Sequence, residues 1–175
     1  KDKATSGTPE RVLTFSGQDR LLPLAGKWSN QAGDGIGLYD PEAKAFYLNK
    51  GTEWGPWPLT VSGPGAPDDG IPYGNRRWNA GSPILGVYSP KTGKVCMVRS
   101  LDAPTCDNSV TLRAGETYIP FSGDWYGDGL DRVGLFDTFL SRWQFWFEYS
   151  GATSYQTFGP APSTMKPFAG RWNVN

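Results

Sequence analysis

A short motif recurs four times along this chain of 175 residues, and each copy ends on a tryptophan. The four tryptophans lie 50, 47 and 47 residues apart. A second motif follows the first three copies: a glycine, then leucine or valine, then tyrosine or phenylalanine. A fixed period of this size is typical of repeat architectures, in which each copy forms one unit of the fold. The first motif occupies Pro23–Trp28, Pro72–Trp78, Pro120–Trp125 and Pro167–Trp172, and the second begins at Gly37, Gly86 and Gly134.

The composition between these motifs favours short strands over helices. The chain has 23 glycines, 15 prolines, eight Trp, eight Tyr and nine Phe, a mixture typical of many short strands joined by tight turns. In residues 142–149, aromatic side chains alternate with other residues, the period-two pattern of a strand with one buried face. We therefore expect an all-β fold of tandem four-stranded antiparallel sheets.

The repeat also predicts how the chain is divided. Residues 10–17 resemble the fourth strand of a unit, and residues 166–175 resemble a first strand. Terminal strands from opposite ends of a chain are one way in which ring-shaped arrays of sheets protect their edges. We expect an N-terminal extension at residues 1–9 and one repeat domain at 10–175, with units at about 22–70, 71–118 and 119–165.

Charge and residue usage exclude several function classes. Seventeen basic and seventeen acidic residues cancel, which argues against nucleic-acid binding, and no apolar run is long enough to span a membrane. The chain has no histidine, so it has neither a Ser-His nor a Cys-His pair. The adjacent acids Asp68 and Asp69 lie in a segment rich in glycine and proline, where a solvated turn is expected. We expect no catalytic residues.

Cys96 and Cys106 are the only cysteines and lie ten residues apart. We expect a disulfide across a loop of the second unit, the alternative being two buried thiols. A metal site lacks a suitable spacing and any histidine. A disulfide indicates an oxidising compartment, so we expect a secreted or cell-surface protein.

Four local patterns together resemble a known repeat. They are Pro-x-x-Gly-Asp-Trp at 120–125, Gly-Asp-Gly at 127–129, Gly-Leu-Phe at 134–136, and Asp-Pro at 40–41. They are similar to the FG-GAP or VCBS-type repeats of bacterial secreted and surface proteins, which form the blades of integrin-like β-propellers. The resemblance covers about residues 10–175. It implies a propeller-like array that serves as a platform for binding or assembly.

Three complete units are fewer than the four to eight blades of most propellers. Two copies of the chain joined in one ring would explain this number. The chain would also fit as a piece of a longer array, or its units would close on themselves as a pseudo-threefold β-trefoil.

The resemblance also implies a calcium loop in the third unit. Asp124 and Asp128 match acidic positions of the calcium motif, Gly129 matches its turn glycine, and Asp131 would complete the oxygen shell. Tyr126 stands where another ligand belongs. The alternative is a turn closed by its own hydrogen bonds. Lysine and arginine stand in the corresponding loops of the first two units, so we expect no calcium there.

The tryptophans fall into two groups. Those that end the repeated motif, at positions 28, 78, 125 and 172, are expected to pack between units. Trp54 and Trp57, in a predicted loop, Trp146, in the polar register of its strand, and Tyr126 are the candidate ligand-binding aromatics. Exposed rings of this kind suit a carbohydrate or a protein surface.

The expected function is a non-catalytic extracellular module for binding or assembly, with a second copy or another protein as partner. The alternative is a carbohydrate-binding lectin with aromatic sugar sites on the repeats. An enzyme ranks third.

Overall fold

The computed structural model describes residues 20–28, 35–50, 53–60, 67–75, 85–129, 131–146 and 153–157, together with Pro167. Every regular element in these ranges is a strand. None of the described segments is a helix long and apolar enough to cross a membrane. The predicted lone strands at 10–17 and 166–175, and the tryptophans at 78 and 172, lie outside the described residues.

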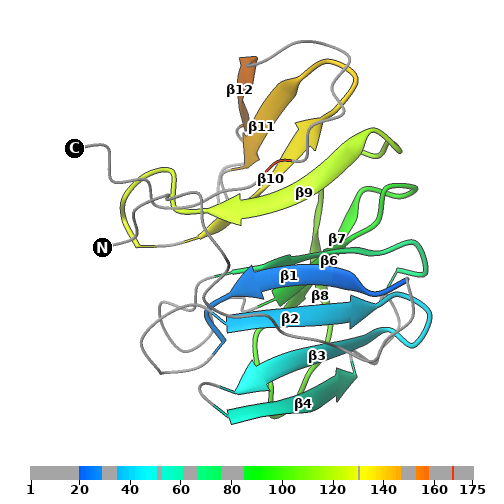
Figure 1. Cartoon of the computed structure of the whole chain (residues 1–175). Helices are drawn as coiled ribbons and strands as arrows, with labels where there is room; N and C mark the ends of the chain where they lie inside the picture. Colours follow the sequence, from blue (N-terminus) through cyan, green and yellow to red (C-terminus); the bar gives the residue numbers. More distant parts are fainter. Residues whose placement is uncertain are drawn as a thin grey trace, which may run out of the picture.

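Within the described ranges, twelve strands form three separate antiparallel sheets of four, so the expected fold class is confirmed. In each sheet the strands follow one another in chain order, and Figure 1 shows the sheets as distinct layers. Sheet 1 contains β1 (Leu22–Gly26), β2 (Gly35–Asp40), β3 (Ala45–Lys50) and β4 (Glu53–Thr60). Sheet 2 contains β5 (Ile71–Gly74), β6 (Leu85–Tyr88), β7 (Lys94–Val98) and β8 (Asp107–Thr111). Sheet 3 contains β9 (Tyr118–Gly123), β10 (Arg132–Asp137), β11 (Arg142–Trp146) and β12 (Thr153–Thr157).

One prediction about a strand is wrong. The segment around Trp54 and Trp57, expected to be a loop, belongs to β4, in which Trp57 lies opposite Leu48. Gly55 and Pro56 suggested a turn. However, β4 pairs with β3 alone among the described strands, and a strand at an edge tolerates proline because its outer side needs no backbone donor.

The two faces of each sheet have different neighbours. We call the face toward the next sheet along the chain the forward face, and the other the backward face. The register of the strands places equivalent residues on equivalent faces in all three sheets. The forward faces carry Leu24, Tyr39, Phe46 and Leu48 in sheet 1, Tyr73, Tyr88, Val95 and Met97 in sheet 2, and Phe121, Phe136, Trp143 and Phe145 in sheet 3. The backward faces carry Ile36, Leu38 and Tyr47 in sheet 1, Leu85, Val87, Cys96 and Val98 in sheet 2, and Val133, Leu135 and Gln144 in sheet 3.

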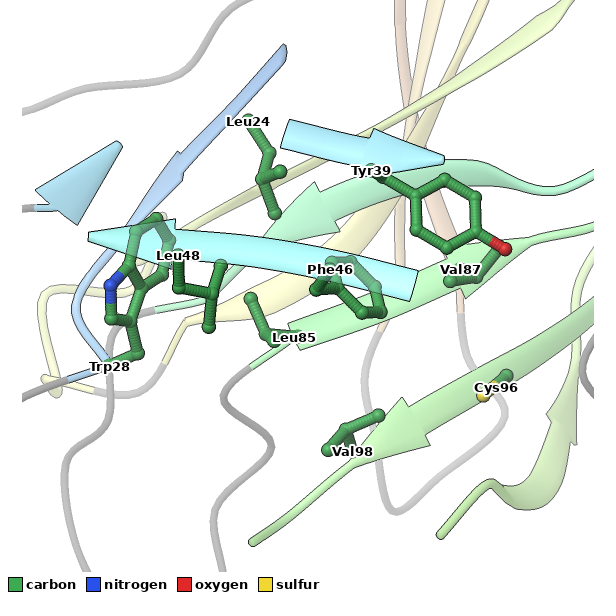
Figure 2. Close-up of a cluster of buried hydrophobic side chains, with 9 residues drawn as sticks. All are labelled: Leu24, Trp28, Tyr39, Phe46, Leu48, Leu85, Val87, Cys96 and Val98. Carbon is green, nitrogen blue, oxygen red and sulfur yellow. The ribbon is translucent and has the colours of Figure 1, made fainter. Parts of the chain in front are cut away.

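Two hydrophobic clusters join the sheets in sequence. In the first, the forward face of sheet 1, with Trp28, packs on the backward face of sheet 2 (Figure 2). In the second, the forward face of sheet 2 packs on Val133 and Leu135 of sheet 3. Sheet 2 is therefore buried on both faces, and all four residues of β6 are buried. The repeated Trp28 is 4% exposed, as expected for a packing role.

The second motif has a steric explanation. A Cβ atom on Gly86 would lie 2.0 Å from Cζ of Tyr73, and one on Gly134 would lie 2.4 Å from Cζ of Phe121. These rings follow the proline of the first motif and lie across the glycine of the neighbouring strand. The two motifs therefore depend on each other, because the glycine makes room for the ring.

A disulfide joins Cys96 to Cys106, with their Cα atoms 4.9 Å apart. Cys96 lies in β7 and is fully buried in the first cluster, and Cys106 precedes β8 and packs against that cluster. The bridge therefore ties the loop between β7 and β8 to the interface of sheets 1 and 2.

The first strands of the three sheets approach one another closely. A Cβ atom on Gly74 of β5 would lie 2.0 Å from the carbonyl oxygen of Ala25 in β1. The amide of Lys27 donates a hydrogen bond to the carbonyl of Asn75 at 3.0 Å, and the Ser122 hydroxyl donates one to the carbonyl of Gly74. Ala25, Gly74 and Ser122 occupy the same position of the first motif, so small residues recur where the strands meet.

We predict that Gly74→Ala destabilises the fold by about 2–3 kcal/mol, because the added methyl group must push β1 and β5 apart. The matched control is Gly26→Ala in β1, whose Cβ would meet its nearest neighbours at 3.1 Å and should cost less. Urea unfolding of both variants measures the difference. A Gly74→Ala variant as stable as the wild type would contradict the close approach.

Candidate functional site

The turn between the second and third strands has the same design in each sheet. The carboxylate of Asp40 accepts hydrogen bonds from the amides of Glu42 and Ala43 at 3.0 and 3.1 Å. Asp137 does the same for the amides of residues 139 and 140. The last turn residue is left-handed in all three sheets, with φ of 51° at Lys44, 71° at Gly93 and 49° at Ser141. These carboxylates therefore shape the hairpin turns.

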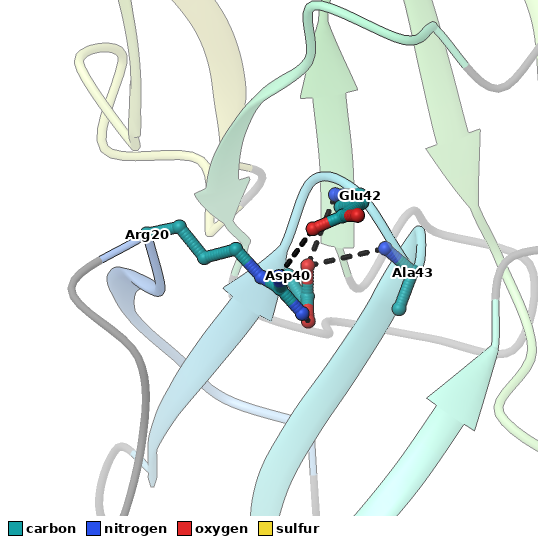
Figure 3. A network of polar contacts seen from close by, with 4 residues as sticks. All are labelled: Arg20, Asp40, Glu42 and Ala43. Atoms are coloured by element: carbon teal, nitrogen blue, oxygen red, sulfur yellow. Dashed lines mark hydrogen bonds and ion pairs between the residues drawn. The ribbon is translucent and has the colours of Figure 1, made fainter.

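In each unit, the residue three positions before the proline of the first motif reaches this turn. In sheet 1, Arg20 donates to Asp40 at 2.9 Å and also pairs with Glu42 (Figure 3). In sheet 2, Asp69 accepts hydrogen bonds from the Ser89 hydroxyl and from the amide of Lys91, both at 2.9 Å. In sheet 3, the carbonyl of Thr117 accepts from Thr138. The contact is kept while its chemistry changes from an ion pair in sheet 1 to hydrogen bonds accepted by a carboxylate in sheet 2 and by a backbone carbonyl in sheet 3.

These contacts shift the pKa of two carboxyl groups. The hydrogen bond from Arg20, with those from the turn amides, lowers the pKa of Asp40 and outweighs desolvation. Desolvation raises the pKa of Asp69, but the hydrogen bonds from Lys91 and Ser89 together reverse it and lower the pKa. Asp68 is 91% exposed and pairs with Lys44 at 2.5 Å. Asp68 and Asp69 are therefore in different surroundings, and Asp69 accepts hydrogen bonds that stabilise the turn between β6 and β7.

We predict that the Arg20–Asp40 pair makes the free energy of unfolding fall as the pH is lowered. A lowered folded pKa contributes stability above the unfolded pKa of about 4, and this contribution disappears as the pH falls through the folded value. Arg20→Met should therefore flatten the decline in unfolding free energy below about pH 4. Arg99→Met, which removes the exposed pair with Asp107, should leave that slope close to wild type. Equal slopes in the wild type and Arg20→Met would contradict this role.

In the third loop, the carboxylates of two predicted calcium ligands, Asp124 and Asp128, are engaged by groups of the protein itself. The Asp124 carboxylate accepts hydrogen bonds from the amides of Asp128 and Gly129 at 3.1 and 2.7 Å. The Asp128 carboxylate accepts two hydrogen bonds from the Arg132 guanidinium at 2.9 and 2.6 Å. Arg132 also lies over the ring of Tyr126, 4.8 Å from its centre. Asp124 therefore fits the alternative to calcium binding that the sequence offered, a turn closed by its own hydrogen bonds.

The chemistry of this loop sets a condition on calcium binding. The Arg132 side chain is only 11% exposed and engages both oxygens of Asp128. A calcium ion that used Asp128 would therefore have to displace the guanidinium, and two positive charges cannot share this carboxylate favourably. Within the described ranges, no group of three or more acidic, histidine or cysteine side chains is arranged to hold a metal.

We predict that calcium competes with Arg132. Arg132→Met should raise calcium affinity relative to wild type, and Asp128→Ala should remove it. Isothermal titration of the three proteins with calcium measures this order. Equal, negligible heats in all three would end the calcium hypothesis for Asp124, Asp128 and Asp131.

The predicted ligand-binding aromatics are not gathered at one place. Trp54 and Trp57 belong to β4 of sheet 1, whereas Trp146 ends β11 of sheet 3. The structure does not describe the side chains of these three residues. Tyr126 is 47% exposed beside Arg132.

An aromatic group that sequence reasoning did not select as a site lies on the forward face of sheet 3. Phe121 contacts Trp143 with ring centres 4.9 Å apart, and Trp125 contacts Phe145 at 5.1 Å. The Trp125 Nε1 group is buried and has no hydrogen-bond partner among the described residues. Trp143, Phe145 and Trp125 are only half-buried. The alternation of residues in β11 predicted an apolar face on this strand. It did not predict that this face would lie on the last of the three described sheets.

Comparisons of the chain with protein-family models, curated proteins and solved structures find no match.

Proposed function

We propose that this chain is a non-catalytic extracellular module for binding or assembly, built from β-propeller-type repeats and completing its array with a second chain. The observation that carries this proposal is the directional packing of the sheets. A forward face packs on a backward face at both internal interfaces. The same packing therefore provides surfaces for adding a further sheet at either end.

The polar groups in the described ranges support a structural role for the repeats. The carboxylates of Asp40, Asp69, Asp124 and Asp137 each accept hydrogen bonds from backbone amides of a turn. The disulfide is compatible with an oxidising, extracellular location. Calcium at the third loop would then be an accessory to assembly, with Asp124, Asp128 and Asp131 as its ligands.

A lectin is the second candidate, and the aromatic group around Trp125 favours it. A half-buried indole beside Phe121 and Phe145 offers an apolar surface for a sugar ring.

We predict that the purified chain forms a stable complex with itself or with another protein and gives no glycan signal. Light scattering with and without EDTA measures the mass and the need for calcium, and a glycan array measures sugar binding. Glycan binding that is lost in folded Trp125→Ala, Trp54→Ala or Trp57→Ala would favour the lectin. Turnover of a glycoside or an ester would contradict both.

A further inference from the structure

The two internal interfaces are built alike. Forward-face residues Phe46 and Leu48 of sheet 1 are 0% and 1% exposed, and their counterparts Val95 and Met97 of sheet 2 are 0% and 3% exposed. On the backward faces, Leu85 is fully buried, and Val133 is 4% exposed. The packing buries the same rows of side chains each time.

The end faces carry the same rows of side chains but leave part of each row more exposed. On the backward face of sheet 1, Ile36 is 38% exposed, although its counterpart Leu85 is fully buried. Leu38 and Tyr47, on the same face, are half-buried. On the forward face of sheet 3, Phe121 and Phe136 are 5% and 1% exposed, whereas Trp143 and Phe145 are half-buried although their counterparts in the other sheets are buried. In the part of the chain that the structure describes, neither face belongs to a cluster that joins two sheets.

We infer that the forward face of sheet 3 binds the backward face of sheet 1 of a second copy of this chain. This inference rests on the proposed assembly function and names its interface. Both faces are apolar along these rows, and their aromatic and aliphatic side chains correspond to those that already pack in the two internal interfaces. The partner is a second copy because the chain itself carries both halves of an interface that it forms twice internally.

The contacts between the first strands of the sheets, β1, β5 and β9, are compatible with the same packing between two copies. Within the chain, Ala25 of β1 lies against Gly74 of β5, and Gly74 lies against Ser122 of β9. Ser122 would meet Ala25 of the second copy in the same way, and Ala25 is exposed on β1. In the part of the chain that the structure describes, each copy offers one forward and one backward end face. Two copies related by a twofold axis would then form two identical contacts and close a ring of the six described sheets.

The experiment measures the mass of the whole chain by light scattering across a range of concentrations. We expect a dimer in the wild type. Ile36→Glu should raise its dissociation constant by at least about tenfold, because it places a charge in the apolar contact. Ile36 is exposed, so this variant should fold, and urea unfolding checks that it does. Phe139→Glu is the control, since Phe139 is 63% exposed in a turn and lies on neither end face.

A mixture of two variants tests whether the forward face of one copy binds the backward face of the other. Phe145→Glu should also dissociate, and an equal mixture of Ile36→Glu and Phe145→Glu should regain association, weaker than wild type, because one of the two contacts is then intact. Absence of association in the mixture of the two folded variants would overturn the forward-on-backward contact.

Other outcomes separate this interface from the proposed function. A wild-type monomer, or a dimer that survives Ile36→Glu, overturns the interface, and so does equal dissociation in Phe139→Glu. In each case assembly with another protein or through another face still satisfies the proposed function. Only enzymatic turnover or a chain that binds neither protein nor glycan contradicts the function itself.

Discussion

The close approach of β1, β5 and β9 is the constraint on which the rest of the structure depends. Sheets that meet at their first strands with backbones in contact need small residues there, and Ala25, Gly74 and Ser122 supply them. Because the first strands are fixed, the forward faces of sheets 1 and 2 each lie against the next backward face, and the large side chains fill the space between them. The repeated glycines at 86 and 134 then accommodate the rings that follow the prolines. Backbone contact and ring packing are thus parts of one arrangement.

Variation between the units is concentrated in polar contacts. The contact from the strand entry to the hairpin turn changes from Arg20–Asp40 to Asp69–Ser89 to Thr117–Thr138, while the turn keeps its shape. The carboxylate or hydroxyl satisfies backbone amides that the turn would otherwise leave to water. The loop after the repeated tryptophan varies as well, and in the third unit Arg132 engages the carboxylate that the calcium motif would use. The repeats therefore share their packing and differ in their surface chemistry.

Much of the fold follows from sequence, because glycine, proline and aromatic side chains act locally. The period, the four strands per unit and a disulfide across a loop of the second unit all follow from the pattern. The strand at Trp54 and Trp57 was missed because Gly55 and Pro56 are turn formers, and only the edge position of β4 permits them. The ion pair between Arg132 and Asp128 depends on how the loop folds back, which residue spacing alone does not determine. The exposure of the end faces depends on which sheets are neighbours, and this is a property of the tertiary structure.

The central claim is that consecutive sheets meet through their first strands, with the backbone of β5 in contact with that of β1. The most direct measurement is the nuclear Overhauser contact between the α-protons of Gly26 and Gly74, together with hydrogen exchange at the amide of Lys27. The account predicts a strong cross-peak and a protected amide, because that amide donates to the carbonyl of Asn75. A missing cross-peak with free exchange at Lys27 in the folded protein would contradict it.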